Sequence, residues 1–565
     1  MSADAESARE LPRAAARLRQ SARYDEAERT LLRALELEHD FAPAHFELGM
    51  TYSDQAHFEE AADYFQLAVH FKPDLIAAWL QLGATLVRLG RADAAQAAYR
   101  ETLAREPTHG GAWRDLGNLL KAGGDWNAAI DCYTSAAACD PASADVHSRL
   151  GYALYQVGRY AASTASFERA LALQPDMVEA RHNLGLLLLE TGQPEEALRS
   201  FEQALAGNPA IVETRACVAH ALRDLGRLDA AIERYDEVLA THPDFTDALN
   251  NRTYALLMKE EYAAGWPAYE CRFTNGGLAA RDFPYPQWQG ESLAGKRILV
   301  YAEQGLGDEI MFASCLPDLL ESAGHCVIEC NTRLAKLFQR SFPRAHVYGA
   351  AKHDDKNWLA KLPRVDCQTA IGSLPHHFRR ARPDFPPHHG YLSADNRRVA
   401  HWRQQLAAAP AVRVGIAWRG GMLRSRQTVR SIGLPQWLPL LRSSGVEFYA
   451  LQYGDIAAEL AALRVESGTA PASLGSAVDD LDELAAIVTT LDLIISVDNT
   501  VAHLAGALGR PVWTLLPASP EWRYPRHGDA MPWYPSMRLF HRARGETWQP
   551  VLERVCAELC RVERG

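Results

Sequence analysis

The chain has 565 residues, 48% of them hydrophobic and 23% charged, a composition typical of a globular protein large enough for two or three domains. Residues 1–296 hold 28 Lys and Arg against 43 Asp and Glu, whereas the remainder holds 31 against 27, so the net charge of −11 comes from the first part. The acidic first part argues against a nucleic-acid partner, and the second part suits a small anionic ligand.

Location and redox state follow from what the sequence lacks. There is no apolar run of about 18 residues, and the first residues have neither the basic nor the apolar segment of a signal peptide. The ten cysteines are scattered and form no Cys-x-x-Cys pair, which favours free thiols over disulfides or a zinc site. We therefore expect a cytoplasmic protein with no membrane span, no metal site and no nucleic-acid partner.

A strict 34-residue repeat organises the first half. Prolines recur at this spacing, one aromatic residue per unit keeps the same frame, and glycine and alanine occupy two further fixed positions. The pattern resembles the tetratricopeptide repeat, in which two helices per unit stack on their neighbours. It predicts an all-α solenoid over residues 1–274 with about seven units. The markers are Pro73, Pro107, Pro141, Pro175, Pro209 and Pro243; Phe65, Tyr99, Tyr133, Phe167, Phe201 and Tyr235; and Gly49, Gly83, Gly117, Gly151 and Gly185.

Such an array serves either as a scaffold or as a surface that captures a polypeptide. We favour a polypeptide acceptor or partner on the concave repeat surface, because extended concave surfaces mainly bind protein. Helical periodicity stops in the Gly-, Pro- and aromatic-rich stretch 275–296, which we interpret as a linker.

The second half begins with strand, glycine loop, helix and strand. A β-branched run at 297–302 precedes a loop with Gly305, Gly307 and Asp308, and a second strand follows at 326–330. This order predicts a doubly wound parallel sheet. Ile310 replaces the third glycine of a dinucleotide motif and no P-loop lysine follows, so a nicotinamide or ATP site is disfavoured. From the residues alone, Asp308 is either a helix cap or a catalytic group.

Three further strands end in polar loops. Residues 411–418 end at Trp418, 447–452 end at Gln452, and 491–497 end at Asp498. Ligands of open parallel sheets bind outside the carboxyl ends of the strands, so these loops should line one crevice. Arginine residues follow the first of these loops and suit a diphosphate through bidentate contacts, with surface arginines on a mobile loop as the alternative.

The third loop starts a helix of small residues. Asp498, Asn499 and Thr500 are good N-cap residues, and the amides behind them lack intrahelical partners, so the helix start could hold a phosphate. His503 lies one turn further along, and a strand is predicted at 511–516.

The motif Asp498-x-x-x-x-His503-Leu-x-x-Ala-Leu-x-x-Pro511 is similar to the C-terminal motif of the heptosyltransferase family of GT-B glycosyltransferases. The resemblance implies an α/β GT-B domain over 297–565, with Rossmann-like halves at about 297–400 and 411–565. It implies a nucleotide sugar as substrate, and no metal or other cofactor. Asp308, in a Gly-x-Gly-Asp loop, matches the family's base. Arg430 is the best match to the basic residue that contacts the phosphates in this family. Asn499 stands where the family usually has Thr.

We therefore expect an inverting, metal-independent glycosyltransferase that moves a sugar from a nucleotide to a Ser or Thr hydroxyl of a polypeptide held by the repeats. The combination of repeats and GT-B domain resembles protein O-glycosyltransferases in outline, including flagellin-modifying ones. Two alternatives remain open. One is a non-catalytic repeat scaffold with a nucleotide-sugar-sensing domain, and the other is a glycolipid or lipopolysaccharide glycosyltransferase.

Overall fold

The computed structural model describes residues 3–274, 281, 283–350, 358–359, 362, 364–406, 412–421 and 426–562. Contacts divide the chain into two compact units, Met1–Leu187 and Leu188–Gly565. Among the helices described, none combines the length and the apolar character needed to cross a bilayer.

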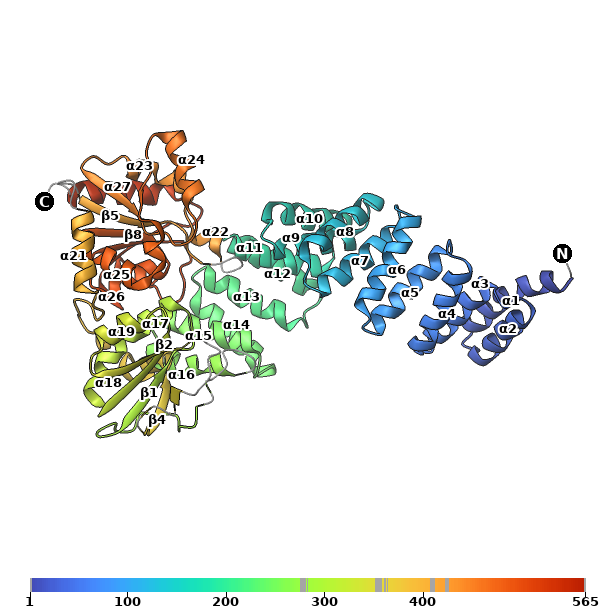
Figure 1. Ribbon diagram of the computed structural model, residues 1–565, viewed down its shortest axis with the longest axis horizontal. Coiled ribbons are helices and arrows are strands. Elements are labelled where there is room, and N and C mark those ends of the chain that lie inside the picture. Colours follow the sequence, from blue (N-terminus) through green and yellow to red (C-terminus); the bar gives the residue numbers. More distant parts are fainter. Residues whose placement is uncertain are drawn as a thin grey trace. The chain divides into compact units, whose positions relative to one another are not determined.

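The first unit is entirely helical (Figure 1). Sixteen helices precede the first strand in the described residues, enough for eight two-helix units where the sequence predicts about seven. The difference is α1, whose residues lack the 34-residue markers. The helices of this unit are α1 Ala3–Gln20, α2 Tyr24–Leu37, α3 Ala42–Asp54, α4 Phe58–Phe71, α5 Ile76–Arg88, α6 Ala92–Arg105, α7 Gly110–Ala122, α8 Trp126–Cys139, α9 Ala144–Gln156, α10 Tyr160–Leu173 and most of α11 Val178–Glu190.

The repeat markers form the contacts inside each pair of helices. Phe65 is fully buried, and a Cβ atom at Gly49 would lie 2.6 Å from its ring, so only glycine allows the two helices to approach this closely. Ser163 is a polar residue at the alanine position of the repeat. It is buried and donates a hydrogen bond to the Gly151 carbonyl oxygen over 2.7 Å. The predicted tetratricopeptide solenoid is confirmed.

The last helices of the array pack against the α/β part of the second unit. They are α12 Pro194–Gly207, α13 Val212–Asp224, α14 Leu228–Thr241, α15 Thr246–Met258 and α16 Tyr262–Tyr269. Trp266 of α16 is buried and donates through Nε1 to the Arg379 carbonyl oxygen over 2.7 Å. The ring of Tyr254 stacks on Trp522 with centroids 5.6 Å apart. These repeats therefore share a core with the α/β part, although the sequence places both in separate domains.

The α/β part contains two sheets. The first has the order β3-β2-β1-β4 and is parallel throughout, and the second has the order β10-β11-β9-β8-β5-β6-β7, with only β10 antiparallel to its neighbour β11. Both orders are doubly wound, as predicted. The strands are β1 Arg297–Tyr301, β2 His325–Asn331, β3 Ala345–Ala350, β4 Cys367–Ala370, β5 Val412–Ala417, β6 Val446–Ala450, β7 Ala472–Ser473, β8 Leu493–Val497, β9 Val512–Leu516, β10 Ala530–Met531 and β11 Tyr534–His541.

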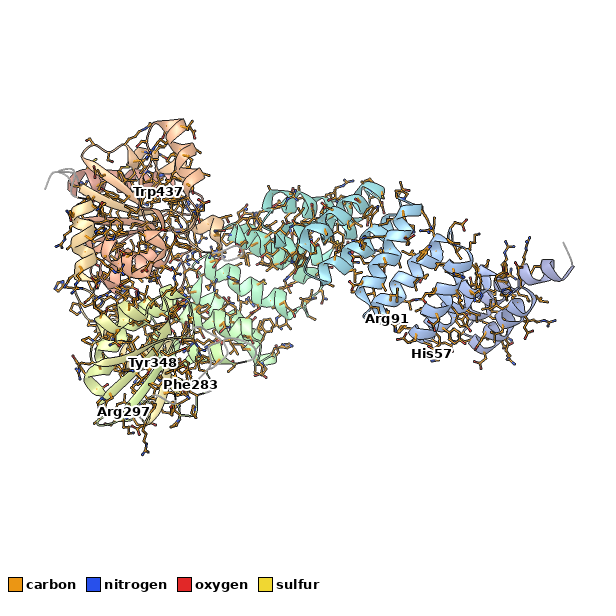
Figure 2. All side chains as sticks on the ribbon, viewed as in Figure 1. His57, Arg91, Phe283, Arg297, Tyr348 and Trp437 are labelled. Atoms are coloured by element: carbon orange, nitrogen blue, oxygen red, sulfur yellow. The ribbon has the colours of Figure 1, made fainter. Side chains whose placement is uncertain are left out.

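Apolar side chains fill both faces of each sheet. One large cluster joins α15 and α16 to the first sheet and to one face of the second, and a separate cluster around Trp437 fills the other face of the second sheet. Phe283 packs on one face of the first sheet, in a cluster that the side chain of Tyr348 of β3 borders (Figure 2). The helices of this part are α17 Leu306–Phe312, α18 Leu316–Ser322, α19 Ala335–Ser341, α20 Leu374–Phe378, α21 Asn396–Gln405, α22 Gln427–Arg430, α23 Leu438–Leu441, α24 Ala457–Ser467, α25 Leu481–Thr490, α26 Thr500–Ala507 and α27 Gln549–Val562.

The passage from the first sheet to the second differs from the expected break at about residue 400. Helix α21 packs on α25 of the second sheet, where Trp402 Nε1 donates to Glu483 over 2.8 Å. This helix therefore belongs with the second half. Of the expected linker, 275–296, residues 275–280 and 282 lie outside the described residues, as does residue 411 at the start of the strand predicted there.

Candidate functional site

The candidate site lies where the strand order of each sheet reverses. In the first sheet β1 lies between β2 and β4, and the chain leaves β1 through Gly305 into α17. In the second sheet the reversal falls between β5 and β8, which are followed directly by Trp418 and Asp498. Open α/β sheets bind ligands at such switch points, because the loops diverge there and leave a crevice.

A pocket of about 300 Å³ collects residues from both sheets. All the site residues expected from the sequence line it except Trp418 and Gln452. The lining residues are Gly305, Leu306, Gly307, Asp308, Gly421, Arg430, Tyr453, Asp498, Asn499, Thr500, His503 and Arg523. The pocket therefore combines the glycine loop of the first half with the capped helix of the second.

Asp498 is buried and ion-paired. Its Oδ2 lies 2.8 Å from Arg430 Nη2, and the same guanidinium nitrogen donates to the Asp498 carbonyl oxygen over 3.2 Å. Burial alone opposes ionisation of Asp498, but the charges of Arg430, His503 and Arg523 outweigh it and hold the pKa of the carboxyl below its ordinary value. The carboxylate thus fixes Arg430 at the pocket wall, and no hydrogen bond from a backbone amide to it is seen in the described residues.

His503 joins the two halves. Its Nδ1 lies 3.0 Å from the Tyr534 hydroxyl and its Nε2 lies 3.9 Å from Asp498 Oδ1. A Cβ atom at Gly307 would lie 3.1 Å from the imidazole, so the glycine lets α17 approach α26. Burial lowers the pKa of His503 to about 4, against the opposing charge of Asp498, and the ring is neutral near pH 7.

Acidification should therefore destabilise the protein through His503. The unfolded imidazole gains a proton near pH 6.5 and the folded one only near pH 4, so the free energy of unfolding falls as the pH drops through this window. We expect His503→Gln to show a smaller loss of Tm between about pH 7 and about pH 5 than the parent protein. His57→Gln, at an exposed position of the first unit (Figure 2), should leave the pH dependence of Tm unchanged. An equal loss of Tm in His503→Gln and the parent would contradict the assignment.

Asn499 is the N-cap of α26. Its Oδ1 accepts from Val501 N at 2.9 Å and Ala502 N at 3.3 Å, and its Nδ2 donates to the Arg419 carbonyl oxygen over 3.1 Å. Two amides at the helix start are thus already occupied. The phosphate site expected at the helix start therefore differs from the prediction, because its positive charge comes chiefly from arginine side chains and not from free backbone amides.

Asp308 faces Arg523 rather than the helix start. The N-cap of α17 is Gly305 and has no side-chain cap bond, whereas Asp308 Oδ1 lies 2.5 Å from Arg523 Nη2 and accepts from its Nε at 2.6 Å. The neighbouring Glu309 is buried and its Oε2 accepts from Asn331 N over 2.9 Å. Asp308 is therefore the pocket carboxylate of this loop, held in an ion pair.

Trp418 and Gln452 do not reach the pocket. Both are buried, and Gln452 Oε1 accepts from the backbone N of Trp418 at 3.1 Å and of Arg419 at 2.8 Å. The pair holds the loop after β5 against the end of β6. Direct contact of these two side chains with a substrate stays a prediction, because neither of them lines the pocket.

Sequence reasoning missed Arg523 as a site residue. Its run, Trp522-Arg523-Tyr524, follows β9, which pairs with β8, so the available signal was a basic residue after a neighbouring strand. Arg523 lies 4.8 Å from the Trp522 ring centroid, and its side chain is 19% exposed. Two cations, Arg430 and Arg523, therefore face one pocket, an arrangement suited to a diphosphate.

Two pairs of adjacent histidines, His376–His377 and His388–His389, lie outside the pocket. The ring centroid of His377, in α20, lies 4.2 Å from that of Trp288, and His388 Nε2 lies 3.0 Å from the Trp533 carbonyl oxygen. Among the described side chains, no group of three or more His, Cys, Asp or Glu residues is arranged to hold a metal ion.

Comparison with known families covers part of this pocket. The glycosyltransferase family 9 (heptosyltransferase) model matches residues 473–560, a span that includes Asp498, His503 and Arg523. Tetratricopeptide-repeat models match residues 42–75, 76–119, 117–158, 140–210 and 219–270. The chain carries tetratricopeptide repeats followed by a glycosyltransferase family 9 domain. The resemblance identified from the sequence motifs is thereby confirmed.

One curated relative is Protein FlbA of Caulobacter vibrioides, 35% identical over 325 residues. The match covers 54% of this chain and 54% of FlbA, so the chain spans about half the length of that relative. Among solved structures, the tetratricopeptide protein YrrB is 17% identical over 33% of this chain and 95% of its own, with a TM-score of 0.31. Pseudomonas aeruginosa pilF is 14% identical over 38% and 97%, with a TM-score of 0.34. At these scores neither structure bears on the function of the family 9 domain.

Proposed function

We propose that this protein is an inverting glycosyltransferase that moves a sugar from a nucleotide-sugar donor to a hydroxyl of a polypeptide acceptor. The observation that carries the proposal is the pocket that brings Asp308 of the first half to Arg430, Asp498 and His503 of the second. The match of residues 473–560 to the glycosyltransferase family 9 model supports the reaction class.

The pocket residues divide the chemistry between the two halves. Arg430 and Arg523 neutralise the diphosphate, whose negative charge grows as the glycosidic bond to it breaks. Asp308 takes the proton of the acceptor hydroxyl while the hydroxyl oxygen attacks the anomeric carbon from the face opposite the leaving diphosphate. Asp308 performs this step only after its ion pair with Arg523 opens, which the arriving diphosphate promotes by competing for the guanidinium. The mechanism needs no metal ion and no cofactor.

The repeats are the proposed acceptor-binding part. Tetratricopeptide arrays present extended surfaces suited to polypeptides, and the last repeats share a core with the family 9 domain. A Ser or Thr hydroxyl of flagellin is the acceptor that we would test first, followed by glycolipid hydroxyls. The cytoplasmic location expected from the sequence stays a prediction.

A nucleotide-sugar sensor without catalysis is the second candidate. The ion pair between Asp308 and Arg523 favours it, because a carboxylate held at 2.5 Å by a guanidinium is a poor base until the pair opens. A sensor would bind the donor and release no free nucleotide diphosphate in the presence of acceptor.

Donor binding should depend on Arg430. A thermal-shift panel first identifies a nucleotide sugar that stabilises the parent protein. We expect Arg430→Gln to bind this nucleotide sugar about tenfold or more weakly, because a charge-assisted pair with the diphosphate is lost. Arg413→Gln is the matched control, since Arg413 pairs with Asp492 in the same sheet and does not line the pocket. A chelator should leave binding and turnover unchanged. Equal donor affinity in the parent protein and Arg430→Gln would remove this residue from the site.

A further inference from the structure

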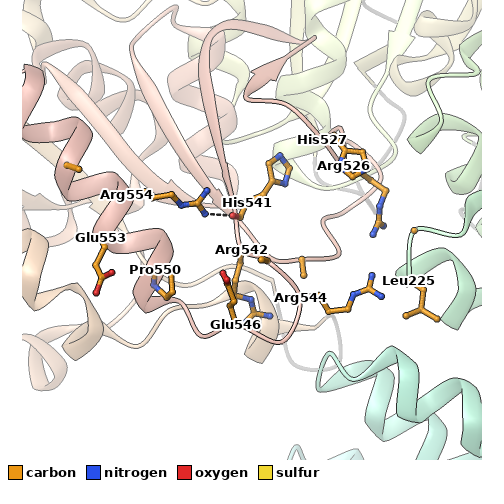
Figure 3. A pocket seen from close by; sticks show the side chains of 14 residues that line it. Leu225, Arg526, His527, His541, Arg542, Arg544, Glu546, Pro550, Glu553 and Arg554 are labelled. Carbon is orange, nitrogen blue, oxygen red and sulfur yellow. Dashed lines mark hydrogen bonds between the residues drawn. The ribbon is translucent and has the colours of Figure 1, made fainter.

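A second, larger pocket opens away from the candidate active site. Its volume is about 940 Å³, and none of its lining residues lines the Asp308 pocket. The walls come from Leu225 and Gly226, between α13 and α14, and from the segments around β11 and the start of α27 (Figure 3). A molecule in this pocket would touch both the last repeats and the family 9 domain.

The pocket is strongly basic although the whole chain is acidic. Two carboxylates, Glu546 and Glu553, also line it. The cationic or ionisable lining residues are Arg526, Arg542, Arg544, Arg554, His527 and His541. Basic residues therefore outnumber acidic ones here, against a net charge of −11 for the chain.

Most of this positive charge has no counter-ion. Arg544 pairs with Glu195 at 2.7 Å, but within the part of the chain that the structure describes no carboxylate lies within 4.0 Å of Arg526, Arg542 or Arg554. Arg526 donates instead to the carbonyl oxygens of Arg223 and Asp224, each over 3.2 Å.

The other two arginines are held without charge compensation as well. Arg554 donates to the His541 carbonyl oxygen over 2.5 Å, as the dashed line in Figure 3 shows. Arg542 lies 4.8 Å from the Trp548 ring centroid, and its buried Nε has no hydrogen-bond partner. Burial and the like charge of Arg426 lower the pKa of Arg542. Arg526 and Arg542 are half-buried and Arg554 is exposed, so an anionic ligand would supply the counter-charge that the two half-buried guanidinium groups lack.

We propose that this basic pocket docks an acidic segment of the acceptor polypeptide, a proposal that rests on the proposed function. Its volume far exceeds that of a single phosphate, and no Trp, Tyr or Phe lines it on which a nucleotide base could stack. The two glutamates suit spaced carboxylates better than a dense polyphosphate. Because one wall is a repeat loop, docking here would hold the acceptor where the repeats meet the enzyme.

The test uses the full-length protein and a fluorescent peptide in which Glu alternates with Ser, with a Gln-for-Glu peptide as the neutral counterpart. Of the two peptides, we expect only the Glu peptide to bind. The variant Arg554→Gln should bind it about fivefold more weakly than the parent protein, and the double variant Arg542→Gln/Arg554→Gln about twentyfold more weakly. Arg561→Gln, on the same helix but paired with Glu558 outside the pocket, is the control and should bind as the parent does.

Three results would overturn the docking site: equal binding of both peptides, unchanged affinity in Arg554→Gln and the double variant, or displacement of the Glu peptide by tripolyphosphate at lower concentration than by unlabelled peptide. Assaying sugar transfer separately distinguishes the two proposals. Arginine-dependent peptide binding without transfer to any acceptor would support the docking site while refuting the proposed function. Transfer with unchanged kcat/KM in the double variant would refute the docking site alone.

Discussion

Asp308→Asn should lower the rate of sugar transfer by about two to four orders of magnitude, the usual contribution of a positioned general base. Asparagine keeps the shape of the side chain and can still accept a hydrogen bond from Arg523, but it cannot take a proton. Donor affinity and Tm should change little. Single-turnover transfer, with donor binding measured separately by thermal shift, would separate chemistry from binding.

Two companion variants make this result specific. Asp492→Asn removes the carboxylate of an Asp–Arg pair beside the second sheet, neither member of which lines the pocket, and should leave the rate unchanged. Arg523→Gln frees Asp308 from its ion pair and should weaken donor binding more than it impairs proton transfer. A stable Asp308→Asn enzyme with the parental rate would show that this carboxylate only positions Arg523.

Asp224→Asn should destabilise the second unit by about 3–5 kcal/mol, the usual effect of removing one partner from a buried ion pair. Asp224 ends α13 and is 2% exposed, and its oxygens lie 3.1 Å from Arg223 and 3.3 Å from Arg426. Burial opposes its charge, but Arg426 and Arg223 outweigh burial and hold the pKa of Asp224 far below its ordinary value. The amide would leave two guanidinium groups unneutralised between the repeats and the family 9 domain.

Denaturant unfolding followed by tryptophan fluorescence measures this loss, since Trp266 and Trp522 lie in the core that the repeats share with the α/β part. Asp229→Asn is the control. Asp229 pairs with Lys259 but its side chain is 88% exposed, so its loss should be nearly neutral. Equal midpoints for the two variants would mean that the Asp224 cluster is solvated in solution.

Periodic features of the fold were predictable from the sequence. The 34-residue spacing predicts the helix pairs because a marker contact such as that of Gly49 with Phe65 recurs in the next three units, at Gly83, Gly117 and Gly151. Strands β1, β5, β8 and β9 were found within two residues of their observed ends, since buried parallel strands are continuous apolar runs. Helix α1 lacks the markers, and the packing of α16 on Phe312 joins segments with no shared pattern.

The location of the site was predictable from the sequence, but the pairing of its side chains was not. Strand ends indicate where Asp308, Arg430 and His503 gather, because parallel topology places them at one edge. The partner of Asp308 is Arg523, 215 residues away, and no local pattern specifies that pair. The burial of Trp418 and Gln452 likewise depends on which side of the sheet α24 covers, and Trp418 Nε1 donates to Glu459 of that helix.

The division of the chain at Leu187 has a practical meaning for anyone who wishes to redirect this protein. In the second unit, which begins at Leu188, the repeats from α13 onward are tied to the family 9 domain by Tyr254, Trp266 and Asp224. Foreign repeats grafted in place of residues 1–187 would leave that shared core intact. A chimera joined at residue 274, where the repeat pattern itself ends, would expose the core.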